Sequence, residues 1–183
     1  MILYIYFLGS DNMARVVRVT TEIMLKCKEN NVDIDYFKLQ KLVYLCQYVH
    51  YGRFNVPLCP ENIYNWTNGG GFKEIYAFFK INNIYESCDN INISMLERQI
   101  DKLENINHNI LSFEKETINF VLNNYANMNF EILKELVLND PLYKNINIGD
   151  RVDLEKLNDL FITKKEIKDI QSTIKLRKSL NSK

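Results

Sequence analysis

Hydrophobic positions recur along this chain mostly at helical spacing. Residues 13–29 carry one apolar stripe, made of Val16, Thr20, Ile23, Met24 and Cys27, which predicts a first helix. Asp35 has the side chain of a good N-cap and predicts a second helix over residues 36–51. We expect its buried face to consist of Leu39, Leu42, Val43, Cys46, Val49 and His50. The residues predicted to lie mostly away from that face are Lys38, Lys41, Gln47 and Tyr48.

The stretch after the second helix predicts a turn-rich connection. Glycine and two prolines exclude helix from residues 52–65. The run Ile63–Trp66 suits a short strand, and Gly69–Gly71 suits a turn that tolerates positive φ. A third helix is expected over residues 72–81. This order allows a small β-hairpin near residues 54–70.

Five further helices are predicted from caps and spacing. They are a helix over 94–110 with a capping box from Ser94 to Glu97, a helix capped by Ser112, a short helix capped by Asn129, a helix over 153–161, and a final helix opened by the capping box from Thr163 to Glu166. The predicted fold class is therefore mainly α, a compact bundle of about seven or eight helices. Residues 1–12 form an N-terminal extension or short strand, and residues 146–183 form C-terminal helices with a basic tail.

Charge limits the partners that the chain can take. The 23 basic and 23 acidic residues balance, whereas general nucleic-acid binding relies on surplus Lys and Arg. The tail is an exception. Its basic residues include Lys164, Lys165, Lys168, Lys175, Arg177 and Lys178. They allow an alternative role as an RNA-binding module, against the simpler interpretation of a solvated helix.

Cysteines, histidines and carboxylates offer weaker candidates for chemistry. Cys46 and His50 lie one helical turn apart and Cys59 follows, but a fourth metal ligand is missing, so we expect no metal and no cofactor. The absence of Cys-x-x-Cys pairs and of a secretory signal predicts reduced thiols and a cytoplasmic location in a bacterial host cell. The apolar opening segment is too short to span a membrane. Carboxylates crowd one region, as Glu131, Glu135, Asp140, Asp150, Asp153, Glu155 and Asp159. They allow a hydrolase, a face for a basic partner, or simple solubility, and we expect no enzyme.

The glycine turn is the best candidate for a recognition surface. It lacks the Gly-Lys-Ser/Thr of a nucleotide loop, so we expect it to let the backbone pass close to the indole of Trp66. Tight turns present side chains well, and interfaces favour aromatic anchors. The predicted partner-binding residues are Trp66, Asn68, Phe72, Lys73 and Tyr76. Core packing is the alternative for Trp66.

Several motifs together resemble the Panacea domain, a family that occurs in SocA-like antitoxins and phage-associated proteins. Phe37–Tyr44 is similar to its L-Q-K-L-L-Y helix, and Trp66 with Gly69 and Gly70 is similar to its A-W-x-x-G-P turn. The helix of residues 72–80 and the segment Phe130–Tyr143 are similar to the segments that follow in the family. The resemblance covers roughly residues 13–145.

The chain departs from the family pattern at several positions. Asn65 replaces Ala, Gly70 replaces Pro, Val137 and Leu138 replace Thr-His, and Leu142 with Tyr143 replaces Trp. The resemblance implies a non-catalytic, protein-binding inhibitor that neutralises a partner protein. That partner would be a toxin or, for a phage-encoded anti-CRISPR-type inhibitor, a host defence nuclease.

Overall fold

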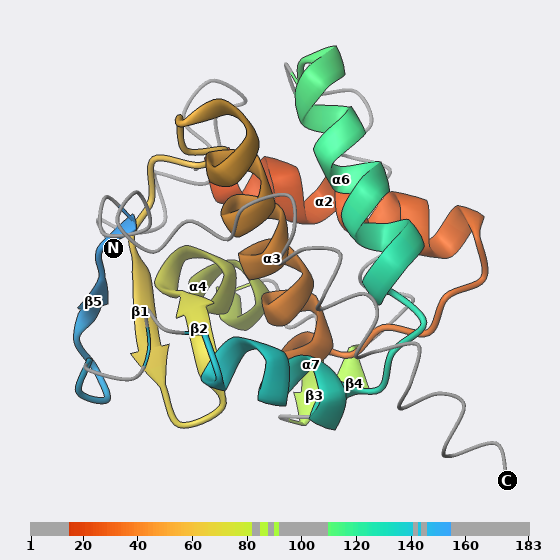
Figure 1. The fold of residues 1–183 in the computed structure, drawn as a ribbon. Helices are drawn as coiled ribbons and strands as arrows, with labels where there is room; N and C mark the ends of the chain where they lie inside the picture. The colour runs from red at the N-terminus through yellow and green to blue at the C-terminus, as the bar shows by residue number, and fades with distance from the viewer. Residues whose placement is uncertain are drawn as a thin grey trace, which may run out of the picture.

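The computed structural model describes residues 15–81, 85–87, 90–91, 110–140, 143 and 146–154. These residues form a mainly helical domain with two small sheets (Figure 1). The helices are α2 (Arg15–Glu29), α3 (Tyr36–Phe54), α4 (Lys73–Ile81), α6 (Ser112–Tyr125) and α7 (Phe130–Leu138). The strands are β1 (Ile63–Trp66), β2 (Gly69–Phe72), β3 (Tyr85–Ser87), β4 (Asn90–Ile91) and β5 (Arg151–Val152).

The mainly helical class is confirmed, but the predicted count of seven or eight helices is not matched. Five helices occur in the described residues. The helices expected over 94–110 and from Thr163 lie outside the described residues, and so does all but the start of the one over 153–161. The expected extension of residues 1–12 also lies outside them. No helix in the described ranges is long and apolar enough to cross a membrane.

Helix α3 is the centre of the domain. It contacts α2, α6, α7 and β2, and Figure 1 shows it running between these elements. Six consecutive residues, from Leu39 to Tyr44, are buried, so the helix has no single apolar face. The prediction that Lys41 and Gln47 point outward is therefore wrong: they are 2% and 0% exposed.

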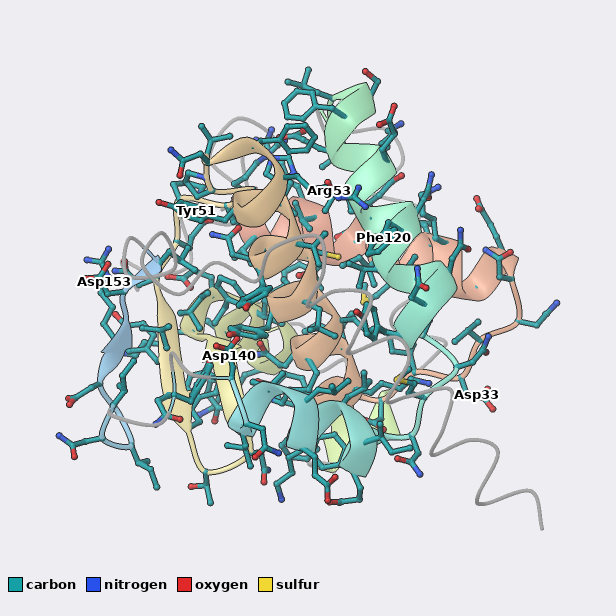
Figure 2. All side chains as sticks on the ribbon, viewed as in Figure 1. Asp33, Tyr51, Arg53, Phe120, Asp140 and Asp153 are labelled. Atoms are coloured by element: carbon teal, nitrogen blue, oxygen red, sulfur yellow. The ribbon has the colours of Figure 1, made fainter. Side chains whose placement is uncertain are left out.

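The ends of α3 differ in how well the sequence predicts them. Asp35 is the N-cap as predicted, and its side chain accepts a hydrogen bond from Lys38 N at 2.7 Å. The predicted end at Tyr51 is wrong, because the helix continues through Gly52 to Phe54. Asn55, in the left-handed region at φ 57°, ends it. Packing against α6 supports the extra turn, since the Arg53 guanidinium lies 4.2 Å from the Phe120 ring centroid (Figure 2).

The predicted hairpin exists, but its boundaries shift. β1 and β2 pair antiparallel with Ile63 opposite Phe72 and Trp66 opposite Gly69. The three glycines are thus strand residues, and the turn consists of residues 67–68. Phe72 ends β2, so α4 begins one residue later than predicted.

A strand that the sequence analysis did not predict completes the sheet. β5 pairs with the other edge of β1, giving the order β2-β1-β5. Asn65 holds the preceding loop: its side-chain Nδ2 donates to Ile146 O at 2.8 Å and its backbone N–H donates to Asp150 O at 2.9 Å. A polar side chain where the family pattern has Ala therefore anchors the loop that leads into β5.

Helix α7 starts as predicted, whereas α6 starts one residue earlier than predicted, with a different cap. Asn129 caps α7, accepting from Ile132 N at 2.9 Å. The N-cap of α6 is Leu111 rather than Ser112. The backbone N–H of Leu111 donates to Glu114 Oε2 at 2.7 Å, so a carboxylate in the first turn satisfies the N–H of the N-cap residue.

Candidate site at the hairpin turn

A pocket of about 190 Å³ lies where the β1–β2 turn meets the start of α3. We call it the turn pocket. Its lining residues are Tyr36, Phe37, Gln40, Lys41, Trp66, Thr67, Asn68 and Gly69. The ring centroids of Phe37 and Phe130 lie 5.7 Å apart, so α7 packs against the Phe37 side of the pocket. The pocket therefore joins two segments that are distant in the sequence, and α7 packs behind one of its walls.

A second hollow, of about 300 Å³, lies between the loop before β1 and strand β5. It is lined by residues between Tyr51 and Ile63 and by Arg151–Leu154. Of the two hollows, the turn pocket is the one that contains predicted partner-binding residues and a buried amine. We therefore build the candidate site on the turn pocket.

Glycine allows the hairpin to approach its neighbours closely. A Cβ atom on Gly71 would lie 2.4 Å from Trp66 Cζ3, which confirms that the backbone passes against the indole. A Cβ on Gly70 would lie 1.7 Å from Tyr143 Oη. Gly69 has φ +85°, where a side chain is strained. Gly70 and Tyr143 are both departures from the family pattern, and here they lie against each other.

Gln40 and Lys41 attach this hairpin to α3. Gln40 hydrogen-bonds the backbone of Phe72, and Lys41 Nζ donates to Gly70 O at 2.7 Å. Burial, helped by repulsion from Lys134, lowers the pKa of Lys41 to about 7. Near neutral pH this amine is consequently divided between its charged and uncharged forms.

The structure separates the predicted partner-binding residues into three groups. Trp66 and Asn68 are half-buried and line the turn pocket. Lys73 and Tyr76 are exposed on α4, with Lys73 Nζ 3.6 Å from the Tyr64 ring centroid. Phe72 is 0% exposed and belongs to the core, so it offers no surface to a partner in this structure.

The residues weighed for metal binding form a packed polar interior. His50 Nδ1 lies 3.1 Å from Thr117 Oγ1, and its ring stacks on Phe113 at 5.4 Å. Burial lowers the pKa of His50 and raises the pKa values of the Cys46 and Cys59 thiols. Within the described ranges, no group of three or more His, Cys, Asp or Glu side chains could hold a metal ion.

The carboxylates that suggested a hydrolase are dispersed where they are described. Glu131, Glu135 and Asp150 are exposed, whereas Asp140 accepts a hydrogen bond from the buried Tyr44 hydroxyl at 2.8 Å (Figure 2). Glu155 and Asp159 lie outside the described residues. The six basic tail residues proposed to bind RNA, Lys164 to Lys178, also lie outside them.

Sequence reasoning missed Gln40 and Lys41 as site residues. Leu39-Gln40-Lys41-Leu42 has the spacing of an ordinary amphipathic helix, in which the two polar residues would face solvent, but the structure buries both of them. Polar residues inside a buried stretch are explained only by a specific partner. Here that partner is the backbone of the glycine strand, which the pattern of α3 alone does not reveal.

Comparison with known families supports the resemblance found in the sequence. A family model described as the antitoxin SocA-like, Panacea domain matches residues 39–144, more than half of the chain. The chain belongs to this family. The Panacea match spans most of α3, the hairpin, α4, α6 and α7, and so includes most of the turn pocket. Neither the curated proteins nor the solved structures give a significant match.

Proposed function

We propose that this protein is a non-catalytic inhibitor that neutralises a partner protein by binding it through the turn pocket and through exposed residues of α4. Membership of an antitoxin-like family carries the proposal, because it makes a toxin the first class of partner to expect. The site residues agree with binding: half-buried Trp66 and Asn68 line a pocket, and exposed Tyr76 lies on the helix that follows the hairpin. Aromatic anchors beside polar groups are typical of binding hot spots.

A narrower form of the proposal concerns the identity of the partner. The inhibitor acts either on a toxin encoded beside it or, if phage-encoded, on a host defence nuclease of the CRISPR type. Inhibition of either partner requires a stable complex and involves no catalytic turnover. They differ in the cellular effect, since toxin neutralisation restores growth and nuclease inhibition protects incoming DNA.

The test is co-expression of the full chain with the small reading frames next to its gene in a bacterial host. We expect one frame to arrest growth alone, growth to return with this protein, and the two proteins to co-purify in a fixed ratio. A parallel assay measures whether the chain protects a plasmid from a nuclease-based defence system. Failure in both assays, with no co-purifying protein, contradicts the proposal.

Two variants test which surface of the protein binds the partner. Asn68→Glu adds bulk and negative charge at the rim of the pocket, and Tyr76→Ala removes an exposed ring from α4; both are expected to weaken neutralisation at least tenfold. Glu116→Ala is the matched control, because Glu116 is an exposed residue of α6, and Figure 1 shows that helix apart from the β1–β2 hairpin. Equal activity of all three variants rules out both the turn pocket and α4 as the binding surface, while leaving neutralisation itself intact.

A further inference from the structure

Lys41 has more hydrogen-bond donors than the described structure satisfies. A charged lysine carries three N–H donors, and Lys41 makes one hydrogen bond, to Gly70 O. It forms no ion pair with a described residue, although it is 2% exposed. A buried amine normally has a carboxylate partner, since an unpaired charge away from water is costly.

The turn pocket gives such a partner a place to bind. None of its eight lining residues is acidic, and Lys41 is the cationic one. The Asn68 side-chain amide, half-buried in the turn, makes no hydrogen bond to another described residue, so it offers a second donor. Lys134 of α7 is close enough to influence Lys41 electrostatically, and it adds to the positive potential.

We propose that the turn pocket binds one carboxylate, the side chain of an aspartate or glutamate on the partner protein, which pairs with Lys41 Nζ and accepts a hydrogen bond from Asn68. The nature of the partner rests on the function proposed above, whereas the carboxylate site does not. Trp66 and Phe37 would enclose the aliphatic part of the acidic side chain. Enclosure by aromatic rings keeps water from the ion pair and strengthens it.

The size and charge of the pocket favour this ligand over others. Its volume of about 190 Å³ lies below the range of roughly 300–1,000 Å³ typical of small-molecule sites, and suits one side chain. A phosphate group carries more charge and usually binds several cations or backbone N–H groups. Asp35 precedes the lining residue Tyr36, and its carboxylate caps α3, which further disfavours a dianion.

Binding of a carboxylate should be coupled to a proton. Near neutral pH the amine is partly uncharged, because its pKa is about 7 in the unbound protein. A carboxylate in contact favours the ammonium form and raises this pKa. Affinity therefore falls as the pH rises above 7, as the free protein loses the proton that the complex needs.

The test uses N-acetyl-aspartyl amide as the probe and N-acetyl-asparaginyl amide as its neutral counterpart. Full-length protein labelled with ¹³C at lysine Cε is titrated with pH by NMR, and Lys41→Met assigns the Lys41 signal. The aspartyl probe is expected to raise the midpoint of the Lys41 titration by about one pH unit or more, and the asparaginyl probe is expected to leave it unchanged. Lys115, exposed on α6, provides an internal control signal.

Asn68→Leu tests the proposed hydrogen bond from the Asn68 side-chain amide. This test remains valid even if the Lys41→Met variant does not fold. Asn68→Leu is expected to weaken binding of the aspartyl probe about tenfold, as for loss of one hydrogen bond to a charged group. An unmoved Lys41 titration, or an equal shift with the asparaginyl probe or inorganic phosphate, overturns the carboxylate site. Neutralisation of a partner in the co-expression assay is a separate readout, so either proposal can fail alone.

Discussion

The side-chain amide of Gln40 pairs with both backbone groups of Phe72. Its Nε2 donates to Phe72 O at 3.3 Å, and its Oε1 accepts from Phe72 N at 3.1 Å. One heptad later on α3, Gln47 pairs in the same way with Cys59 O and Cys59 N, both at 2.8 Å. Helix α3 thus binds two extended segments as a neighbouring strand would, so the buried backbone groups of both segments are satisfied.

Replacing Gln40 with Leu should destabilise the protein and disturb the turn pocket. The change leaves the buried N–H of Phe72 without its acceptor, at a cost of about 1–3 kcal/mol. Trp66 is the sole tryptophan in the sequence, so its fluorescence reports on the hairpin directly. We expect a lower urea midpoint together with altered Trp66 emission in the folded state.

Gln47→Leu is the matched control for this experiment. It removes the equivalent pair at Cys59, so a similar loss of stability is expected. The folded-state emission of Trp66 should stay as in the wild type, because Gln47 does not line the turn pocket. Equal changes of emission in both variants would mean that Gln40 has no specific role at the hairpin.

The contact between Gly70 and Tyr143 predicts a rescue. Gly70→Ala places a methyl group into the Tyr143 hydroxyl and should cost about 1–3 kcal/mol as overpacking. Tyr143→Phe removes Oη, after which the nearest atoms are Tyr143 Cζ at 2.9 Å and Tyr44 Cδ2 at 3.0 Å. The double variant should therefore recover part of the loss, as measured by thermal unfolding.

Gly149→Ala serves for comparison in the same measurement. A Cβ there meets no atom within 4 Å, so its cost, about 1 kcal/mol, reflects only φ +94°. If Gly70→Ala lowers stability equally in the wild type and in the Tyr143→Phe background, contact with the Tyr143 hydroxyl is not the reason that residue 70 is glycine.

Glu114 should contribute more to stability than an ordinary helix carboxylate. It accepts from Leu111 N at the start of α6 and forms an ion pair with Arg15 of α2, which joins two helices. Glu114→Gln leaves Arg15 without this charge and is expected to cost about 1–3 kcal/mol in urea unfolding. Glu116→Gln, on the exposed face of α6, should change stability by less than about 0.5 kcal/mol. Similar effects of the two changes would contradict the proposed role of Glu114.

Sequence patterns predicted those elements that have one face in the core. α2 was recovered because its apolar residues form a stripe, and Asp35 and Asn129 were recovered because a cap acts locally. β5 could not be recovered, since two residues carry no periodicity and Asn65 holds its loop through tertiary contacts.

Helix α3 shows why part of the candidate site was missed. A helix surrounded on all sides has no outward face, so spacing wrongly assigns Lys41 and Gln47 to solvent. Trp66 and Asn68, by contrast, were found because a tryptophan beside three glycines is a local signal. Pairing of side chains with a distant backbone requires the fold to be known, which is why Gln40 and Lys41 emerged only from the structure.

The stability of the protein should depend on pH through Lys41. Its pKa is about 7 in the folded state and close to the ordinary 10.5 in the unfolded state. Above pH 7 the unfolded chain therefore keeps a proton that the folded protein loses, so the free energy of unfolding rises with pH, by up to about 1.4 kcal/mol per pH unit. This gain in the free energy of unfolding is lost as the pH falls to 7.

The effect is best measured between pH 7 and about 8.5. At higher pH the buried thiols act in the opposite direction, because burial raises the pKa of Cys27 to about 11 while unfolded thiols ionise near 8.5. The measured quantity is the difference in urea unfolding between the wild type and Lys41→Met, which we expect to grow in favour of the wild type as the pH rises. Lys115→Met, at an exposed position, should leave the pH dependence unchanged. A constant difference between wild type and Lys41→Met across this window would show that Lys41 is fully charged in the folded protein, and would remove the basis for its proton-coupled binding.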